Sequence, residues 1–173
     1  MLRRGLAGTR VSDICAKARI SPGHLYHYFD SKDSIIAAFV ETTLEETDGQ
    51  LTERIGGCGP IEAVLTDLGW LKRPEEFALR FEILAQAGRS LKIAKILQSH
   101  SEGLRLKLFE AVRQGQISGE IDEGVDPLLA STALIGVMDA LKAGALRYPE
   151  MDPSTAAASF KPMIERYIAP RPD

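Results

Sequence analysis

Hydrophobic residues along most of this chain recur every three or four positions, which is the spacing of one face of an α-helix. No segment alternates polar and apolar residues for more than a few positions, as a half-buried strand would. Glycine and proline residues divide the periodic stretches from one another. Beyond residue 60 the pattern predicts helices over residues 61–72, 75–87, 91–115, 127–146 and 154–168. The sequence therefore predicts an all-α fold.

The N-terminal part of the chain opens on a short amphipathic helix. Thr9 is a suitable N-cap, and Asp13 lies in the first turn, where the positive end of the helix dipole favours an acid. The apolar side of this helix consists of Val11, Ile14, Cys15 and Ala18. We expect that side to be buried against the helices that follow.

A Ser-Pro-Gly tripeptide at residues 21–23 ends that helix and begins the next one. Ser21 can cap the second helix, and a proline suits its first position because no backbone N–H is needed there. This helix, predicted over residues 22–29, carries Leu25 and Phe29 on one side. Two short helices joined by a tight turn form a helix-turn-helix, whose second helix enters the major groove of DNA.

A longer helix follows, with Ser31 as its cap and Lys32 at its start. Lys32 could meet a phosphate through its own charge and through the N–H groups of that helix end. The glycine- and proline-rich run at residues 56–60 is the clearest break in the chain.

The distribution of charge supports an interaction of the N-terminal part with a polyanion. The whole chain has a net charge of −3, which alone would argue against nucleic acid. Residues 1–35, however, hold six basic and three acidic residues, a net of +3, which leaves −6 for the remainder. A basic segment on an acidic body favours a local contact with DNA.

Residues 8–33 resemble the DNA-binding signature of the tetracycline-repressor (TetR) family. The resemblance is carried by GTRVSDIC at residues 8–15 and ISPGHLYHYFDSKD at residues 20–33, and LYHYFDSKD is its most specific part. The phrase GQISGEIDEGVD at residues 115–126 resembles the stretch that precedes the penultimate helix of the family. The resemblance implies a helix-turn-helix DNA-binding domain over residues 1–45 and a helical effector-binding and dimerisation domain over residues 46–173.

Carried over position by position, the resemblance implies contacts with double-stranded DNA from the second helix and its surroundings. Base or backbone contacts are expected from Pro22, Gly23, His24, Tyr26 and His27. Phosphate contacts are expected from Thr9, Arg10, Tyr28 and Lys32. Leu25 and Phe29 are expected to be structural.

Two departures from the family pattern bear on DNA binding. Family members usually have glycine where this chain has Arg19, and a non-glycine residue in a left-handed helix end costs about 1 kcal/mol. Arg19 could equally add a phosphate contact. Family members also begin with a full helix before the Arg4-Gly5 pair, so we expect most of that first helix to be missing here.

The C-terminal part is expected to enclose a small-molecule effector in an apolar cavity with few polar groups. Most of its apolar residues must simply be core. The candidates for ligand contact are Trp70, Phe77, Phe81, Gln86, Arg89, His100 and Leu104.

The last two predicted helices carry more apolar surface than a terminal hairpin needs, which favours a homodimeric four-helix bundle. The candidate interface residues are Leu134, Val137, Met138, Leu141, Phe160, Met163, Ile164 and Tyr167. Packing within one chain is the alternative for part of this set.

Other classes of function lack a signature. The chain shows no nucleophile–base pattern, P-loop or dinucleotide motif, so we expect neither an enzyme nor a bound cofactor. His24 and His27 lack the further ligands of a metal site. The apolar stretch at residues 128–138 is too short for a membrane span, and with no leader in view we expect a cytoplasmic protein without a membrane partner.

These observations predict a ligand-responsive transcriptional regulator, in the form of a repressor that binds a palindromic operator as a dimer and is released by a small molecule. The alternative is a helical ligand-binding or interaction dimer that has lost DNA binding. The missing first helix and Arg19 favour that alternative.

Overall fold

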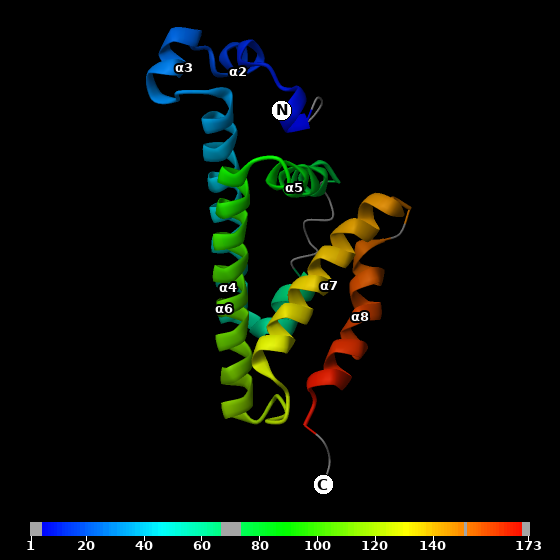
Figure 1. Cartoon of the computed structure of the whole chain (residues 1–173). Helices are drawn as coiled ribbons and strands as arrows, with labels where there is room; N and C mark the ends of the chain where they lie inside the picture. The colour runs from blue at the N-terminus through cyan, green and yellow to red at the C-terminus, as the bar shows by residue number, and fades with distance from the viewer. Residues whose placement is uncertain (1–4, 67–73, 151, 171–173) are drawn as a thin grey trace. The chain divides into compact units, whose positions relative to one another are not determined.

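The computed structural model describes residues 5–66, 74–150 and 152–170, and these residues form helices and connecting turns with no strand (Figure 1). The helices are α1 (Gly5–Gly8), α2 (Val11–Ala18), α3 (Pro22–Tyr28), α4 (Lys32–Thr66), α5 (Pro74–Ala87), α6 (Leu91–Ser118), α7 (Pro127–Arg147) and α8 (Pro153–Ile168). The predicted all-α fold is confirmed. The helices predicted over residues 75–87, 91–115, 127–146 and 154–168 match α5 to α8 with ends within a few residues. The first residues of the helix predicted over 61–72 belong to the end of α4, and residues 67–72 lie outside the described part of the chain.

The chain divides into two compact units. The first comprises Met1–Glu46 and Ala78–His100, and the second comprises Thr47–Phe77 and Ser101–Asp173. The first unit thus contains the predicted DNA-binding segment together with most of α5 and the start of α6. Helices α4 and α6 each contribute residues to both units.

The core of the first unit explains why residues 78–100 belong with the N-terminal segment. Ile36, Val40 and Leu44 of α4 pack with Leu79 and Ile83 of α5 and with Ile93 of α6, and Leu6 of α1 completes this cluster. Leu6 is only 1% exposed. One buried leucine therefore holds the short helix α1 on the rest of the unit.

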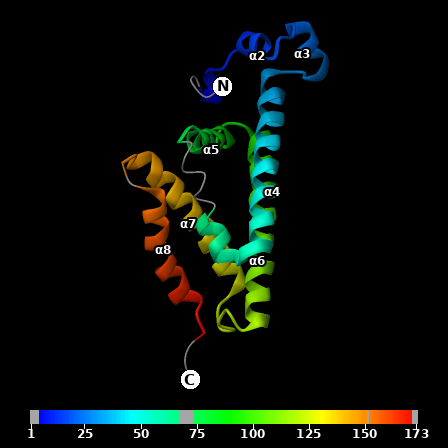
Figure 2. The same ribbon diagram turned by 180° about the vertical axis from the view of Figure 1, so that it is seen from behind.

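The predicted break at residues 56–60 is a kink inside α4 rather than a loop (Figure 2). Gly59 has φ 79° and ψ 168°, whereas the residues on either side continue as helix. A positive φ is accessible to glycine because it has no Cβ. The helix consequently changes direction at this residue.

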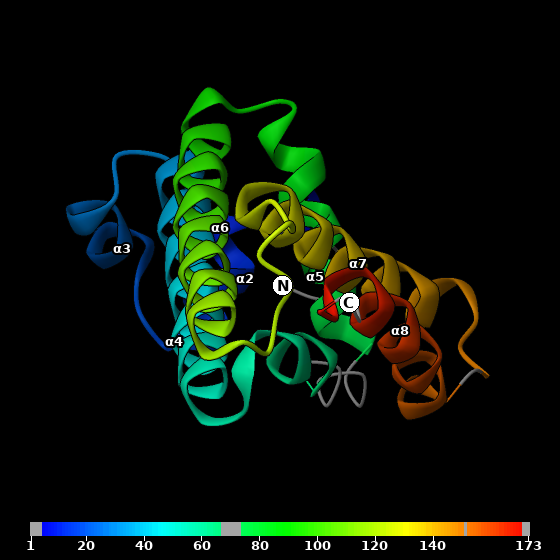
Figure 3. The same cartoon turned by 90° about the horizontal axis from the view of Figure 1, so that it is seen from below.

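The turn between α6 and α7 is built on two glycines (Figure 3). Gly119, with φ 78°, ends α6, and Gly115 lies against Ile121, whose Cδ1 would be 2.6 Å from a Cβ added at that glycine. Backbone N–H groups of residues 120 and 121 donate to the Gly115 carbonyl. The phrase GQISGEIDEGVD therefore encodes a turn that folds back tightly on its helix.

The side chain of Gln116 fixes the rest of this turn. Its Nε2 donates to the backbone carbonyls of Asp122 (3.0 Å), Glu123 (3.3 Å) and Val125 (2.8 Å). The backbone N–H of Asp122 donates to the carbonyl of Ile168 at 2.8 Å, which ties the turn to the end of α8.

Helices α7 and α8 form a hairpin in the second unit, and each begins with an aspartate cap. Asp126 accepts hydrogen bonds from the N–H groups of Leu128 and Leu129, and Asp152 accepts one from Thr155. The main core of the unit joins α7 and α8 to α6 and to the second half of α4, and its buried members are Leu51, Leu104, Leu108, Val112, Ile121, Ala130, Leu134, Met138, Ile164 and Ile168.

Candidate nucleic-acid interface

Helices α2 and α3 are held together by a small apolar core of their own. Cys15 of α2, Leu25 of α3 and Ile35 of α4 are its buried members, and Val11, Ile14, Ile20 and Phe29 pack around them. Leu25 and Phe29 are therefore structural, as expected. The free thiol of Cys15 is buried in this core.

The turn between α2 and α3 has the geometry of a helix-turn-helix. Arg19 is the left-handed C-cap of α2, with φ 58° and ψ 41°. Ser21 caps α3, since its Oγ accepts a hydrogen bond of 3.1 Å from the N–H of His24, and Pro22 occupies the first turn. The left-handed conformation expected at position 19 is confirmed, and this backbone suits glycine better than arginine.

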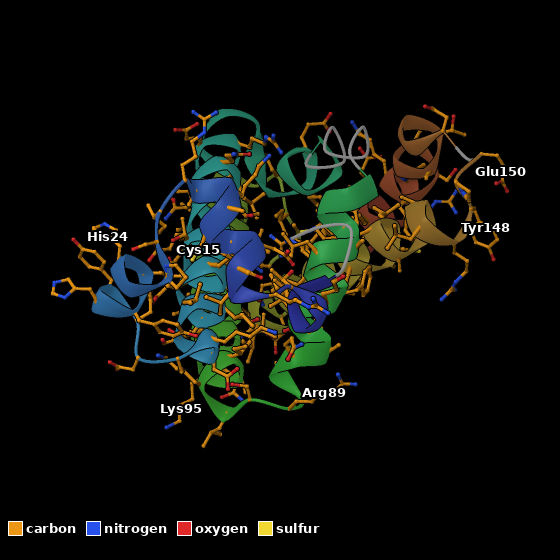
Figure 4. The ribbon with its side chains drawn as sticks, turned by 90° about the horizontal axis from the view of Figure 1, so that it is seen from above. Cys15, His24, Arg89, Lys95, Tyr148 and Glu150 are labelled. Atoms are coloured by element: carbon orange, nitrogen blue, oxygen red, sulfur yellow. The ribbon has the colours of Figure 1, made fainter. Side chains whose placement is uncertain are left out.

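One side of α3 is open to solvent. Gly23, His24, Tyr26 and His27 are all exposed, and Figure 4 shows His24 projecting away from the ribbon while Cys15 lies on its inner side. The ring of Tyr28 meets the rings of His24 and His27 edge to face, with centroid distances of 5.4 and 5.1 Å. Such edge-to-face pairs favour defined ring positions. The residues expected to read DNA thus form one exposed, aromatic surface.

Most of the residues expected to meet phosphate are accessible to solvent. Arg10 and Tyr28 are exposed, with Tyr28 at 68%, and Lys32 is half-buried at the start of α4. Ser31 and Ser34 cap α4 reciprocally, each N–H donating to the other hydroxyl at 3.1 Å. The start of α4 therefore offers a cation beside an ordered helix end.

Thr9 differs from the other expected contacts. Its side chain is 4% exposed, and its hydroxyl donates to the carbonyl of Gly5 at 2.7 Å. Arg10, not Thr9, is the N-cap residue of α2, and its N–H donates to the carboxylate of Asp13. The expectation that Thr9 caps α2 is wrong, because its hydroxyl closes α1 instead.

The residues expected to contact an effector are distributed over both units. Phe81, Gln86, Arg89 and His100 belong to the first unit, whereas Phe77 and Leu104 are buried in cores of the second. Trp70 lies outside the described residues. Arg89 is exposed at the end of α5 (Figure 4). Their contact with a ligand stays a prediction.

The second unit contains a cavity of about 630 Å³ that none of those candidates lines. It lies among the kinked part of α4, the end of α6, the turn that follows, and α8. Its lining residues are Ile55, Gly56, Gly59, Glu62, Ala111, Gln114, Gly115, Ser118, Glu120, Ile121, Lys161 and Glu165. Across it, Lys161 donates a hydrogen bond of 2.9 Å to Glu62. This bond and the negative charge of Glu62 raise the pKa of Lys161 above its ordinary value.

Most of the residues expected at a dimer interface pack inside the chain. Leu134, Met138 and Ile164 are buried in the main core of the second unit, and Leu141 is buried beside Phe77. Val137 and Phe160 pack against the same clusters. These six residues therefore pack in the core of a single chain, which was the alternative for part of this set. Met163 and Tyr167 are instead 53% and 52% exposed.

Helix α7 has a second apolar side that the chain leaves open. Leu129 is 61% exposed, and Ala133, Gly136 and Ala140 continue the same side towards the C-terminus. Only 33% of the most apolar part of α7 is buried, and by length and composition alone this helix could cross a membrane, a test that core helices also pass. The larger residues of α7 in the predicted interface set, Leu134, Met138 and Leu141, are buried in the cores of the second unit instead.

Two further features were not foreseen. Glu82 accepts a hydrogen bond from the backbone N–H of Leu6. The cavity of the second unit lies beside the glycine-rich run that was predicted as a break between helices, not as part of a binding surface. The glycine pair in that run is the sequence feature that could have indicated it.

Comparison with known proteins places these features in context. The sequence model described as "Bacterial regulatory proteins, tetR family" matches residues 1–39. The chain is 28% identical over 159 residues to the HTH-type transcriptional regulator UidR of Escherichia coli strain K12, which covers 90% of this chain and 79% of UidR. It is 42% identical over 50 residues to the HTH-type transcriptional repressor KstR2 of Rhodococcus jostii, covering 29% of this chain and 24% of KstR2.

The fold is also similar to solved structures. Salmonella enterica GusR superposes with a TM-score of 0.79 at 23% sequence identity, covering 96% of this chain and 88% of GusR. A TetR transcription regulator from Haloarcula marismortui gives a TM-score of 0.81 at 18% identity, covering 94% of this chain and 88% of that chain.

Proposed function

Since this chain is a member of the TetR family of transcriptional regulators, we propose that it binds a palindromic operator as a homodimer and leaves it when a small molecule binds. The observation that carries the proposal is the exposed side of α3. His24, Tyr26 and His27 lie on it together, on a helix whose opposite side is anchored by the buried Leu25. A helix of this kind can enter the major groove without losing its own packing.

The phosphate contacts proposed for Arg10, Tyr28 and Lys32 would set the register of α3 on the duplex, while α3 itself reads base edges. Because Thr9 is buried, we expect it to act in the interface by positioning other residues and not by touching phosphate itself. Its hydrogen bond to Gly5 orders the chain immediately before Arg10. Thr9 therefore supports the position of a phosphate contact from within.

The open side of α7 supports the homodimer. Small residues there allow close approach of a second helix, and Met163 and Tyr167 of α8 supply larger exposed apolar groups. A two-fold pairing of this surface would place two copies of α3 symmetrically, as a palindromic site requires. Repression follows because a dimer seated on a promoter blocks polymerase without contacting it.

Release by a ligand requires that the ligand bind one arrangement of the dimer better than the other. Helix α4 is the element through which this preference can act, because it begins beside α3 and its far part is kinked at Gly59. A ligand that changes the bend would shift the start of α4. The regulator would act in the cytoplasm, where both operator and effector are present.

The test is fluorescence anisotropy of the purified protein on the intergenic DNA upstream of its own gene, across a salt series. We expect binding that is at least about a thousandfold tighter than binding to random duplex and that weakens steeply with salt. Equal affinity for both DNAs, including with any in-frame upstream residues added, would instead favour a helical dimer without an operator.

A further inference from the structure

We infer that the cavity of the second unit binds a small organic cation with an apolar body, and that this is the effector of the proposed regulator. That this ligand is the effector rests on the proposed function. Its binding depends only on the residues that line the cavity, which sequence patterns did not indicate.

The size of the cavity suits a ligand of that kind. A volume of about 630 Å³ lies within the range of about 300–1,000 Å³ that holds small molecules in proteins. Its apolar wall comes from Ile55 of α4, Ala111 of α6 and Ile121 of the following turn. Ile121 is 5% exposed and packed against Gly115, so this wall is fixed.

The charged residues that line the cavity favour a positively charged ligand. Glu62, Glu120 and Glu165 line it, against Lys161 as the one basic lining residue. Lys161 is engaged by Glu62 at 2.9 Å, which neutralises both. Glu165 also lies in the field of Lys161, so three carboxylates face one ammonium group and leave an excess of negative charge, whereas an anion would have to displace Glu62 from Lys161. An amine or quaternary ammonium therefore fits the cavity, and a carboxylate or phosphate does not.

The position of the cavity gives its occupant access to the bend in α4. Gly56 and Gly59 both line it, and Gly59 is the residue with the non-helical backbone. A molecule that fills the space beside them would limit how far α4 can straighten or bend further. Binding here is thereby coupled to the helix that begins at Lys32.

The glycines also provide a matched pair of variants. A Cβ added at Gly56 or at Gly57 meets no atom within 4 Å, and both residues are helical, but only Gly56 lines the cavity. Gly56→Trp should fill the cavity, and Gly57→Trp should place the same side chain outside it. Thermal unfolding of both variants shows whether each folds as the parent does.

The experiment is isothermal titration of the full chain with three probes that share one apolar body, namely 1-naphthylmethylamine, 1-naphthylmethanol and 1-naphthoate. We expect the amine to bind about three- to tenfold more tightly than the alcohol, since two exposed carboxylates each contribute modestly, and the naphthoate to show no binding. Gly56→Trp should abolish binding of the amine and Gly57→Trp should leave it unchanged. Glu165→Gln, which does not alter the shape of the cavity, should weaken the amine about two- to fivefold and leave the alcohol unchanged.

Three results would overturn the inference: no binding of the amine at millimolar concentration, tighter binding of the naphthoate, or equal loss of binding in both tryptophan variants. Operator binding is measured on the same preparations. Tight operator binding without amine binding refutes this inference and leaves the proposed function standing. Amine binding by a chain that does not recognise its operator refutes the proposed function and leaves the cation site.

Discussion

The backbone N–H of Leu6 donates a hydrogen bond of 2.7 Å to Oε2 of Glu82, a residue 76 positions later in the chain. Gly5 makes this approach possible, because its φ of +67° and lack of a Cβ leave room for the carboxylate, whose Oε1 would be 2.9 Å from an added Cβ. The bond and the burial of Leu6 together attach α1 to α5 within the first unit.

Replacing Glu82 by alanine should therefore destabilise the chain. The substitution leaves a part-buried N–H without its acceptor, which costs about 1–3 kcal/mol, and it removes the anchor of the segment that leads into α2. Urea unfolding measures the change in the free energy of unfolding. Glu41→Ala, at an exposed position of α4 in the same unit, is the control and should change it by less than about 0.5 kcal/mol. Equal effects of the two substitutions would show that the bond to Leu6 contributes nothing.

His27→Ala and Arg10→Ala should weaken DNA binding in different ways. If His27 contacts base edges, its loss costs about 1–3 kcal/mol on the operator and little on random duplex. If Arg10 contacts phosphate, its loss weakens binding to both DNAs. It also lowers by about one the slope of the logarithm of affinity against the logarithm of salt concentration. Anisotropy on both duplexes separates these patterns, with dimerisation unchanged in either variant. Unchanged operator affinity in His27→Ala would remove that residue from the interface.

Arg19→Gly should make the protein more stable. Arg19 has φ 58°, and glycine at such a helix end is favoured by about 1 kcal/mol over a residue with a Cβ. Lys17→Gly, inside α2 and also exposed, is the control and should destabilise by about 1 kcal/mol. The midpoints of thermal unfolding should thus move in opposite directions. Operator affinity of Arg19→Gly, measured in parallel, reports whether the arginine also contacts phosphate.

Tyr167→Glu and Met163→Glu should dissociate the proposed homodimer. Both side chains are about half exposed in the single chain, so a charge there is tolerated by the monomer but not in an apolar interface. Disrupting the centre of an interface weakens the free energy of dimerisation by about 2 kcal/mol or more, which is roughly a thirtyfold rise in the dissociation constant. Sedimentation velocity over a concentration series measures it. The control is Ile117→Glu, on α6 and 72% exposed, and dissociation by that substitution would place the interface elsewhere.

Gly115→Ala should destabilise the second unit. The added Cβ would be 2.6 Å from Cδ1 of the buried Ile121, and such overpacking costs about 1–3 kcal/mol. Gly103→Ala in the same helix meets nothing within 4 Å and should stabilise by up to about 1 kcal/mol. A stabilising effect of Gly115→Ala in urea unfolding would show that the turn moves freely.

The local features of the fold could be predicted because they depend on neighbours in sequence. The Ser21 cap and the proline start of α3 follow from the chemistry of adjacent residues, and the left-handed Arg19 was expected from the glycine that the TetR family has at this position. Glycine and proline positions predicted the ends of α5 to α8 to within a few residues. The resemblance at residues 20–33 then indicated which side of α3 faces outward.

Features that depend on distant residues could not be predicted. Helical periodicity marks Leu134, Met138 and Ile164 as apolar, but it does not say whether a core or a partner covers them, and in the structure the core does. The attachment of α1 to α5 joins positions 6 and 82, which no local pattern relates. Likewise, the cavity is formed by residues from α4, α6, the turn after α6 and α8, which are far apart in sequence and which no local pattern relates.

The contacts of Gln116 have a consequence for how this protein can vary. Its amide donates to three main-chain oxygens and to no side chain, so these three contacts do not depend on the side chain of Glu123, whereas Asp122 also holds the turn by accepting a hydrogen bond of 2.7 Å from the N–H of Gly124. Exposed positions such as Glu123 can then tolerate many substitutions, whereas position 116 tolerates few. We expect a library randomised at Glu123 to retain the fold wherever Gln116 is kept, and to lose it first where that one amide is replaced.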